Sequence, residues 1–282
     1  MTFAETLFEI ARKDLEAAKC LFERELYPQA VFYLQQSVEK ANKSFAMLSG
    51  IIKEDEKESK AIGHDSMKVY KKSIKEQKEK LEKINEAFKK FPKLKEIKFM
   101  KNLDVEKYYN GAVDLLATIK SLGKERESIL FIPKSDIRSV IRELDKLELE
   151  ELDLKHMEFS KKDLNGIKES YIELLDVFYD FNPQQIEKEK EELEKIITLN
   201  LMEELIEVIQ SIPIKNFMYV SHSLFYLSLI MLPHAIVARY IDNNYNPLKI
   251  YNKNLPLIQL FDDLVEIMEK TLSKLENLLS EY

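Results

Sequence analysis

The sequence is poor in the residues that interrupt helices and in those that crosslink small folds. Its 282 residues include no tryptophan, one cysteine, five glycines and eight prolines. So few glycines and prolines disfavour a fold with many tight turns. A lone Cys20 excludes an internal disulfide framework and favours a reducing compartment. Charged residues, mostly lysine and glutamate, make up 33% of the chain, so we expect an all-α protein of long helices.

Several motifs of common enzyme classes are also missing. The sequence contains no His-Glu-x-x-His, no cysteine pair, no glycine-rich phosphate loop and no nucleophile elbow. We therefore expect no metal and no cofactor. The start of the chain lacks the basic and apolar regions of a signal peptide, so a cytoplasmic location is expected.

The most apolar stretch, residues 217–241, falls short of a membrane span. About twenty uninterrupted apolar residues are needed to cross a bilayer. Here His222, His234 and Arg239 interrupt the stretch and Pro233 is expected to kink it. We predict a central helix, buried on all sides, of a bundle that makes no membrane contact.

The first helix is predicted over residues 3–25. Thr2 and Glu5 form a Thr-x-x-Glu capping box at its start. One apolar stripe follows at spacings of three and four: Phe3, Leu7, Ile10, Ala11, Leu15, Ala18, Leu21 and Phe22. Asp14 lies on this stripe, and a carboxylate on an apolar face must be paired or hydrogen-bonded. We expect its partners on the next helix.

A second helix is predicted from the Tyr27-Pro28 break to Gly50. Its apolar face is flanked by a polar stripe of Gln36, Glu39 and Lys43, in which Glu39 and Lys43 have the favourable i, i+4 order. These polar residues either tie the two helices together or form a cleft that binds a nucleotide or RNA. The pattern alone leaves both interpretations open.

This region resembles a HEPN domain, a helical module of many prokaryotic toxin, antitoxin and antiviral systems. The resemblance rests on an Asp-Leu pair with spaced alanines, a turn tyrosine, a Phe-x-x-Gln-Gln-x-Val-Glu-Lys-x-x-Lys segment and a later histidine. Here these are Asp14, Leu15, Ala17, Ala18, Tyr27, residues 32–43 and His64. The segment from His64 to Lys68 is also similar to the AbiV branch, which acts in abortive infection.

HEPN ribonucleases carry an arginine followed, after four to six residues, by a histidine. No arginine of this chain precedes a histidine at that distance. The nearest arrangement is inverted, His234 before Arg239, and on one helix these side chains point about 140° apart. The resemblance therefore favours a non-catalytic member. The alternative is a metal-independent ribonuclease in which His64 or His234 supplies acid–base chemistry and Arg239 or a lysine stabilises charge.

Residues 67–101 form a basic segment with thirteen lysines and five acids. Such a helix attracts RNA phosphate, or pairs with acidic helices elsewhere in a chain of net charge −7. It lacks arginine and has few aromatic residues, so a solvated helix face is the better interpretation. Further helices are predicted after Pro133, over 164–181 and 182–211, and from Pro256 to Ser280.

Together these observations predict a HEPN-like module over residues 1–110 and a helical extension over 111–282, with one continuous bundle as the alternative. The candidate binding residues are Asp14, Gln36, Glu39, Lys43, His64 and Lys68. The resemblance implies a homodimer with a cleft between subunits. It also implies RNA, a nucleotide, or a nucleotidyltransferase or other defence-system protein as partner. A purely structural assembly module is the third interpretation.

Overall fold

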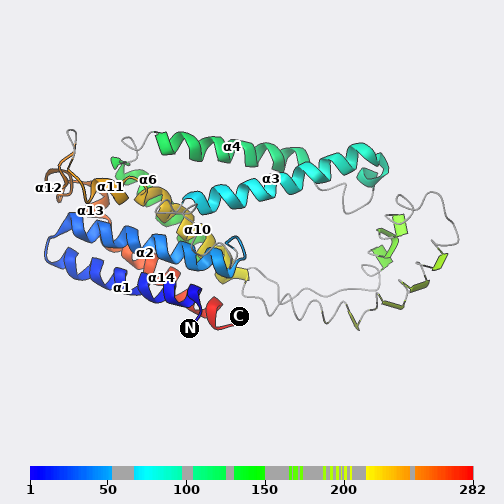
Figure 1. Cartoon of the computed structure of the whole chain (residues 1–282), viewed down its shortest axis with the longest axis horizontal. Coiled ribbons are helices and arrows are strands. Elements are labelled where there is room, and N and C mark those ends of the chain that lie inside the picture. Colours follow the sequence, from blue (N-terminus) through cyan, green and yellow to red (C-terminus); the bar gives the residue numbers. More distant parts are fainter. Residues whose placement is uncertain are drawn as a thin grey trace. The chain divides into compact units, whose positions relative to one another are not determined.

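A computed structural model describes residues 1–52, 67–96, 104–124, 130–149, 214–241 and 245–281, with scattered positions between 165 and 204. The described residues contain helices and no strand, which confirms the predicted all-α class. Figure 1 labels the helices. Their bounds are α1 Phe3–Glu23, α2 Tyr27–Leu48, α3 Met67–Lys90, η2 Pro92–Glu96, α4 Val105–Lys124, α6 Lys134–Leu149, α10 Ile214–Met231, α11 His234–Val237, α12 Pro247–Ile250, α13 Pro256–Gln259 and α14 Phe261–Ser280.

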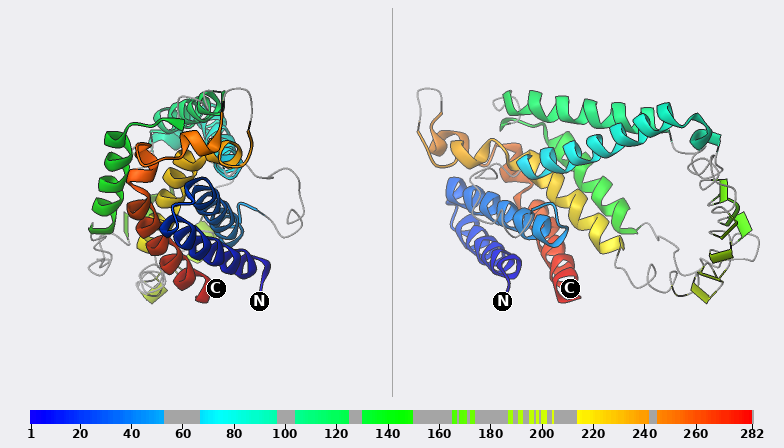
Figure 2. Two further views of the ribbon diagram at one scale, coloured as in Figure 1. Left: turned by 90° about the vertical axis from the view of Figure 1, so that its left-hand side faces the viewer. Right: turned by 45° about the vertical axis from the view of Figure 1, so that its right-hand side comes forward.

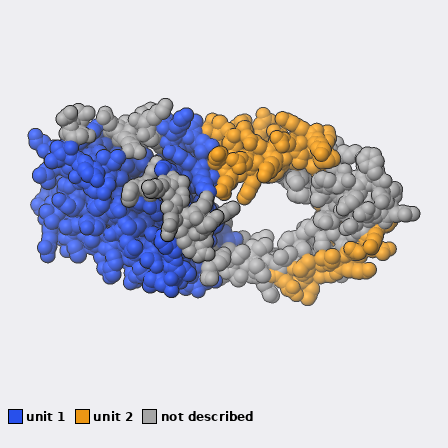
Figure 3. Space-filling model, in the orientation of Figure 1, with its two compact units in different colours: residues 1–74, 115–151, 214–282 blue, residues 75–114, 152–213 orange. Residues whose placement is uncertain are grey.

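The chain divides into two compact units, coloured in Figure 3. Unit 1 comprises Met1–Ile74, Leu115–Glu151 and Ile214–Tyr282, and unit 2 comprises Lys75–Asp114 and Leu152–Pro213. The N-terminal hairpin and the C-terminal helices thus belong to the same unit. The division at residue 110 that the sequence suggested stays a prediction.

Unit 1 is built on an antiparallel hairpin of α1 and α2 (Figures 1 and 2). Both helices pack against α14, and α2 also packs against α10. One continuous apolar core joins these helices, with Leu34 of α2, Leu224 of α10 and Leu264 of α14 all fully buried. Ala11, Leu15 and Ala18 of the predicted apolar stripe are therefore covered from within the same chain, whereas Phe3 and Ile10 of that stripe stay 43% and 40% exposed.

The termini of the hairpin helices follow the local sequence. The capping box is present, because the Glu5 amide donates to Thr2 Oγ1 at 3.1 Å and the Thr2 amide donates to Glu5 Oε2. Pro28 lies in the first turn of α2, where its missing N–H costs no helical hydrogen bond. Glu25, with φ of 58°, and Gly50, with φ of 70°, follow the ends of α1 and α2 in left-handed conformation.

Small residues let α1 and α2 approach closely. Ser37 Oγ donates to the Ala11 carbonyl at 2.7 Å, and Ser44 Oγ donates to the Ala4 carbonyl at 2.8 Å. Both the serines and the alanines are seven residues apart, so the bonds repeat every two turns. These side-chain bonds fix the register of the hairpin.

The apolar stretch over residues 217–241 was predicted to form one helix that is buried on all sides, and the structure differs from this prediction. Helix α10 begins at Ile214 and ends at Met231, and a separate short α11 begins at His234. Pro233 lies between them. It interrupts the helix because proline has no N–H to donate the next helical hydrogen bond. Burial is also incomplete, because Phe217 is 41% exposed and His222 is exposed. The predicted C-terminal helix is likewise divided, into α13 and α14.

Unit 2 contains the basic part of α3. Phe88, Leu94 and Val105 form a small apolar cluster there. Lys78 donates to Glu82 at 2.8 Å, and the Tyr109 hydroxyl donates to the same carboxylate at 3.1 Å. Some lysines of the basic segment thus pair with acids of their own helix. The helices predicted over 164–181 and 182–211 lie largely outside the described residues.

Among the described helices, none combines the length and the hydrophobicity needed to cross a membrane.

Candidate functional site

A polar ladder on the α1–α2 hairpin brings together four of the predicted binding residues. We define the ladder as Asp14 of α1 with Gln36, Glu39, Lys40 and Lys43 of α2. Gln36, Lys40 and Lys43 share a half-buried side of α2 because they are four and seven residues apart. Hydrogen bonds and ion pairs connect the ladder from end to end.

The first link joins the two helices. Lys40 Nζ lies 2.9 Å from Asp14 Oδ2, with the lysine and aspartate side chains only 22% and 16% exposed. Lys40 Nζ also donates to Gln36 Oε1 at 2.9 Å. Asp14 Oδ2 is buried and has no directed hydrogen bond, so the contact with Lys40 is an ion pair without hydrogen-bond alignment. The expected partner of Asp14 does lie on the second helix.

The second link is centred on the buried carboxylate of Glu39, which is 3% exposed. Lys43 Nζ donates to Glu39 Oε1 at 2.8 Å. The amide nitrogens of Gln35 and Gln36 approach Oε2 at 3.4 and 3.5 Å. Burying a carboxylate is costly unless it is paired and hydrogen-bonded, and Glu39 has both kinds of partner.

A second polar network adjoins the ladder inside unit 1. Asn42 is 1% exposed, accepts a hydrogen bond from the Tyr70 hydroxyl at 2.7 Å and donates to Ser228 Oγ. Burial raises the pKa of the Tyr70 hydroxyl, while its bonds to Asn42 and Ser228 oppose that shift. The network attaches the first turn of α3 to α2 and α10.

No described contact joins the two remaining predicted residues to the ladder. His64 falls outside the described residues. Lys68 is exposed on the first turn of α3, and among the described residues no hydrogen bond or ion pair joins it to the ladder. The structure therefore joins Asp14, Gln36, Glu39 and Lys43 in one network, whereas no described hydrogen bond or ion pair joins Lys68 to it.

His234 and Arg239, the alternative catalytic pair, occupy different surroundings, His234 at the start of α11 and Arg239 just beyond its end. His234 is 1% exposed, and its Nδ1 is hydrogen-bonded to the Tyr251 hydroxyl at 2.7 Å. Burial lowers the pKa of His234 from 6.5 to about 3 and raises that of the Tyr251 hydroxyl. Arg239 is exposed, and its guanidinium lies against the Phe32 ring.

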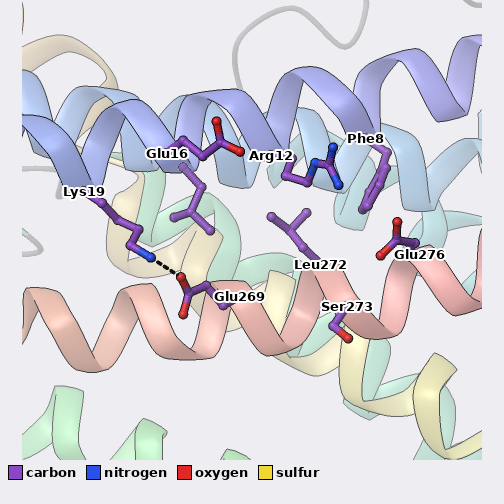
Figure 4. Close-up of a pocket in the computed structure, with 9 residues that line it drawn as sticks. Phe8, Arg12, Glu16, Lys19, Glu269, Leu272, Ser273 and Glu276 are labelled. Carbon is purple, nitrogen blue, oxygen red and sulfur yellow. Dashed lines mark hydrogen bonds and ion pairs between the residues drawn. The ribbon is translucent and has the colours of Figure 1, made fainter.

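An open groove of about 350 Å³ lies between α1 and α14 (Figure 4). Phe8, Leu15 and Leu272 supply its apolar surface. Lys19 and Glu269 point toward one another across it and form an ion pair, which raises the pKa of Lys19. Its other cation, Arg12, pairs with Glu9 at 3.1 Å. The groove thus has both cations neutralised by neighbouring carboxylates.

The described part of the chain contains no group of three or more histidine, cysteine, aspartate or glutamate side chains arranged to hold a metal ion.

Sequence reasoning left several residues out of the candidate site. Lys40 stands in the same motif as Gln36 and Glu39, so its i, i+4 spacing from Gln36 was an available signal. Asn42 and the pairing of Phe32 with Arg239 carried no such local signal, because their partners are distant in the sequence.

Comparison with known families agrees with this geometry. A family model described as HEPN domain matches residues 4–122, which confirms the predicted resemblance over that part of the chain. The similarity to the AbiV branch stays a prediction.

One similar protein is named "Putative toxin MJ1304", from Methanocaldococcus jannaschii. It is 44% identical over 50 residues, which cover 18% of this chain and 33% of that protein. The chain thus spans about a third of the length of this curated relative. No solved structure gives a significant match.

Proposed function

We propose that this chain is a non-catalytic binding component of a prokaryotic toxin–antitoxin or defence system. We further propose that it acts through a hairpin face comprising Leu7, Ile10, Asp14 and Ala17 of α1 and Gln36, Lys40 and Lys43 of α2. The HEPN match and the similarity to a protein named as a toxin support the general role. A second copy of the chain is the partner that the face fits best.

The charge balance of the polar ladder carries this proposal. Lys40 and Lys43 contribute two positive charges, and Asp14 and Glu39 contribute two negative charges at distances of 2.8 to 2.9 Å. Binding to RNA phosphate gains free energy chiefly from cations that release counterions. A lysine already paired with a carboxylate gains little in this way. The neutral ladder therefore favours a protein surface over RNA.

The α1 side of the face supplies apolar contact. Leu7, Ile10 and Ala17 are three and seven residues apart and share one side of the helix with Asp14. Ile10 is 40% exposed, whereas Leu7 and Ala17 are half-buried. Interfaces combine apolar contact with hydrogen-bonded polar groups. A second copy presents the same neutral surface and so adds no net repulsion across a two-fold axis.

The surroundings of His234 argue against the ribonuclease alternative. A general acid or base must reach the substrate and have a pKa near the working pH. His234 is 1% exposed and its pKa is lowered to about 3 by burial. It therefore stays neutral and enclosed at neutral pH. His64 is the remaining candidate for acid–base chemistry.

Incubating the purified protein with labelled RNA in the absence of metal tests the proposal. We expect neither cleavage nor tight binding at physiological salt, for wild type and for His64→Ala and His234→Ala. Cleavage that either substitution abolishes would establish the ribonuclease alternative. Tight RNA binding that weakens in Lys40→Gln and Lys43→Gln would assign the hairpin face to RNA.

A further inference from the structure

The Arg239 guanidinium lies over two aromatic rings on the surface of unit 1. Its Cζ lies 4.8 Å from the centroid of the Phe32 ring on α2 and 5.0 Å from that of Tyr240. Such stacking orients the planar group while leaving its edge available for hydrogen bonds. Its Nε donates to the Ala235 carbonyl at 3.1 Å, which further fixes the side chain.

The outer edge of this guanidinium has no counter-ion in the described part of the chain. No described carboxylate lies within ion-pair distance of Arg239, and the described residues offer its two Nη nitrogens no hydrogen-bond partner. An oriented guanidinium presents two parallel N–H donors that match the two oxygens of a carboxylate. Because its orientation is fixed beforehand, less side-chain entropy is lost on binding.

The surroundings of Arg239 are apolar. Ile236 is 47% exposed, and Tyr240 is 57% exposed. Arginine and tyrosine are enriched among the residues that dominate protein–protein binding energies, particularly where apolar neighbours exclude water. An oriented arginine with exposed apolar neighbours is therefore suited to bind a charged side chain of a partner protein.

We propose that Arg239, stacked against Phe32 and Tyr240, binds a carboxylate of a partner protein that carries an apolar residue beside that carboxylate. This inference rests on the proposed function, in which the chain acts through protein partners. It adds a second contact point, because Phe32 lies on α2 one helical turn before Gln36 of the hairpin face. The proposal thus gives Arg239 a binding role in place of the catalytic role of the ribonuclease alternative.

A carboxylate suits this position better than a phosphate. A nucleotide or RNA phosphate is usually held by several cations, whereas the nearby Lys40 and Lys43 are already paired with Asp14 and Glu39. One guanidinium that pairs with no described carboxylate matches one negative charge. The exposed Ile236 side chain adds an apolar contact that a peptide side chain can make and a phosphate cannot.

The probe is a leucine–glutamate–leucine tripeptide with an acetylated N-terminus and an amidated C-terminus. The same peptide with glutamine in place of glutamate, and inorganic phosphate, are the comparison ligands. Binding is followed through the Arg239 Nε–H signal in nitrogen-15 NMR spectra, assigned by its loss in Arg239→Lys. We expect the glutamate peptide to shift the signal and to bind at least tenfold more tightly than the glutamine peptide.

One variant tests the ring contact, and a second is its control. Phe32→Leu keeps the guanidinium and removes its ring, so we expect severalfold weaker binding of the glutamate peptide. Arg24→Lys changes another exposed arginine and should leave binding unchanged. Equal binding of both peptides, no shift with either, or tighter binding of inorganic phosphate would overturn the proposal. Because the assay needs no second copy, a monomeric chain that binds the glutamate peptide refutes only the self-association.

Discussion

Asn42 links three helices of unit 1 through the two ends of its amide. Its Oδ1 accepts a hydrogen bond from the Tyr70 hydroxyl of α3 at 2.7 Å, and its Nδ2 donates to Ser228 Oγ of α10. The Tyr70 ring also packs edge-on against Phe225 of α10, with 5.0 Å between centroids. The side chain of a single α2 residue therefore holds the start of α3 against the hairpin.

We predict that Tyr70→Phe lowers the free energy of unfolding by about 1–3 kcal/mol. The substitution keeps the ring contact but leaves the buried Asn42 oxygen without its donor. Urea unfolding followed by circular dichroism measures the loss. Tyr108→Phe, at a 57% exposed position, is the matched control and should change stability by less than about 0.5 kcal/mol. Equal stabilities for the two variants would show that the Asn42 bond contributes nothing.

Because Asp14 and Lys40 form an ion pair, we predict that substitutions at these two residues have non-additive effects on stability. Lys40→Met leaves the largely buried Asp14 carboxylate without a counter-ion and should cost about 2 kcal/mol. Adding Asp14→Asn removes the uncompensated charge, so the double variant should be more stable than Lys40→Met alone. A double-mutant cycle from urea unfolding gives the coupling. A coupling energy near zero would mean that the pair is only a surface contact.

His234 predicts a pH dependence of stability. Its folded pKa, about 3, lies below its ordinary value of 6.5, so between these values only the unfolded chain binds the proton. Stability from this group is therefore complete above pH 6.5 and is lost as pH falls toward 3, by at most about 1.4 kcal/mol per pH unit.

The comparison of wild type with His234→Phe measures this effect. Carboxylates also titrate in this range, so the relevant quantity is the difference between the two pH profiles. We expect the variant to lose less stability than wild type between pH 6.5 and 4. Parallel profiles for wild type and His234→Phe would contradict the assigned pKa.

The features that the sequence predicted correctly are local ones. The capping box of Thr2 and Glu5 and the Glu39–Lys43 pair each lie within one helix, where spacing alone brings side chains together. The break at Pro233 was expected only as a kink. Neighbouring contacts decide whether a helix bends or ends at a proline, and here α10 ends two residues earlier, at Met231.

The features that the sequence did not predict depend on packing. Asn42 and Ser228 are 186 residues apart, and no periodicity in either helix indicates that they meet. The choice of Lys40 as the partner of Asp14 depends on the hairpin register, which the serine–alanine bonds set. The charge balance of the ladder, on which the proposed function rests, became apparent only once these pairs were known.

Light scattering during size-exclusion chromatography tests the central claim most directly. At micromolar concentration, the wild-type chain and Leu248→Glu, which adds a carboxylate at a 75% exposed position of α12 outside the hairpin face, should both have twice the mass of one chain. Ile10→Glu places the same charge within the hairpin face and should give the mass of a single chain. A wild-type mass equal to one chain, or an Ile10→Glu dimer as stable as wild type, would contradict the assignment of the hairpin face.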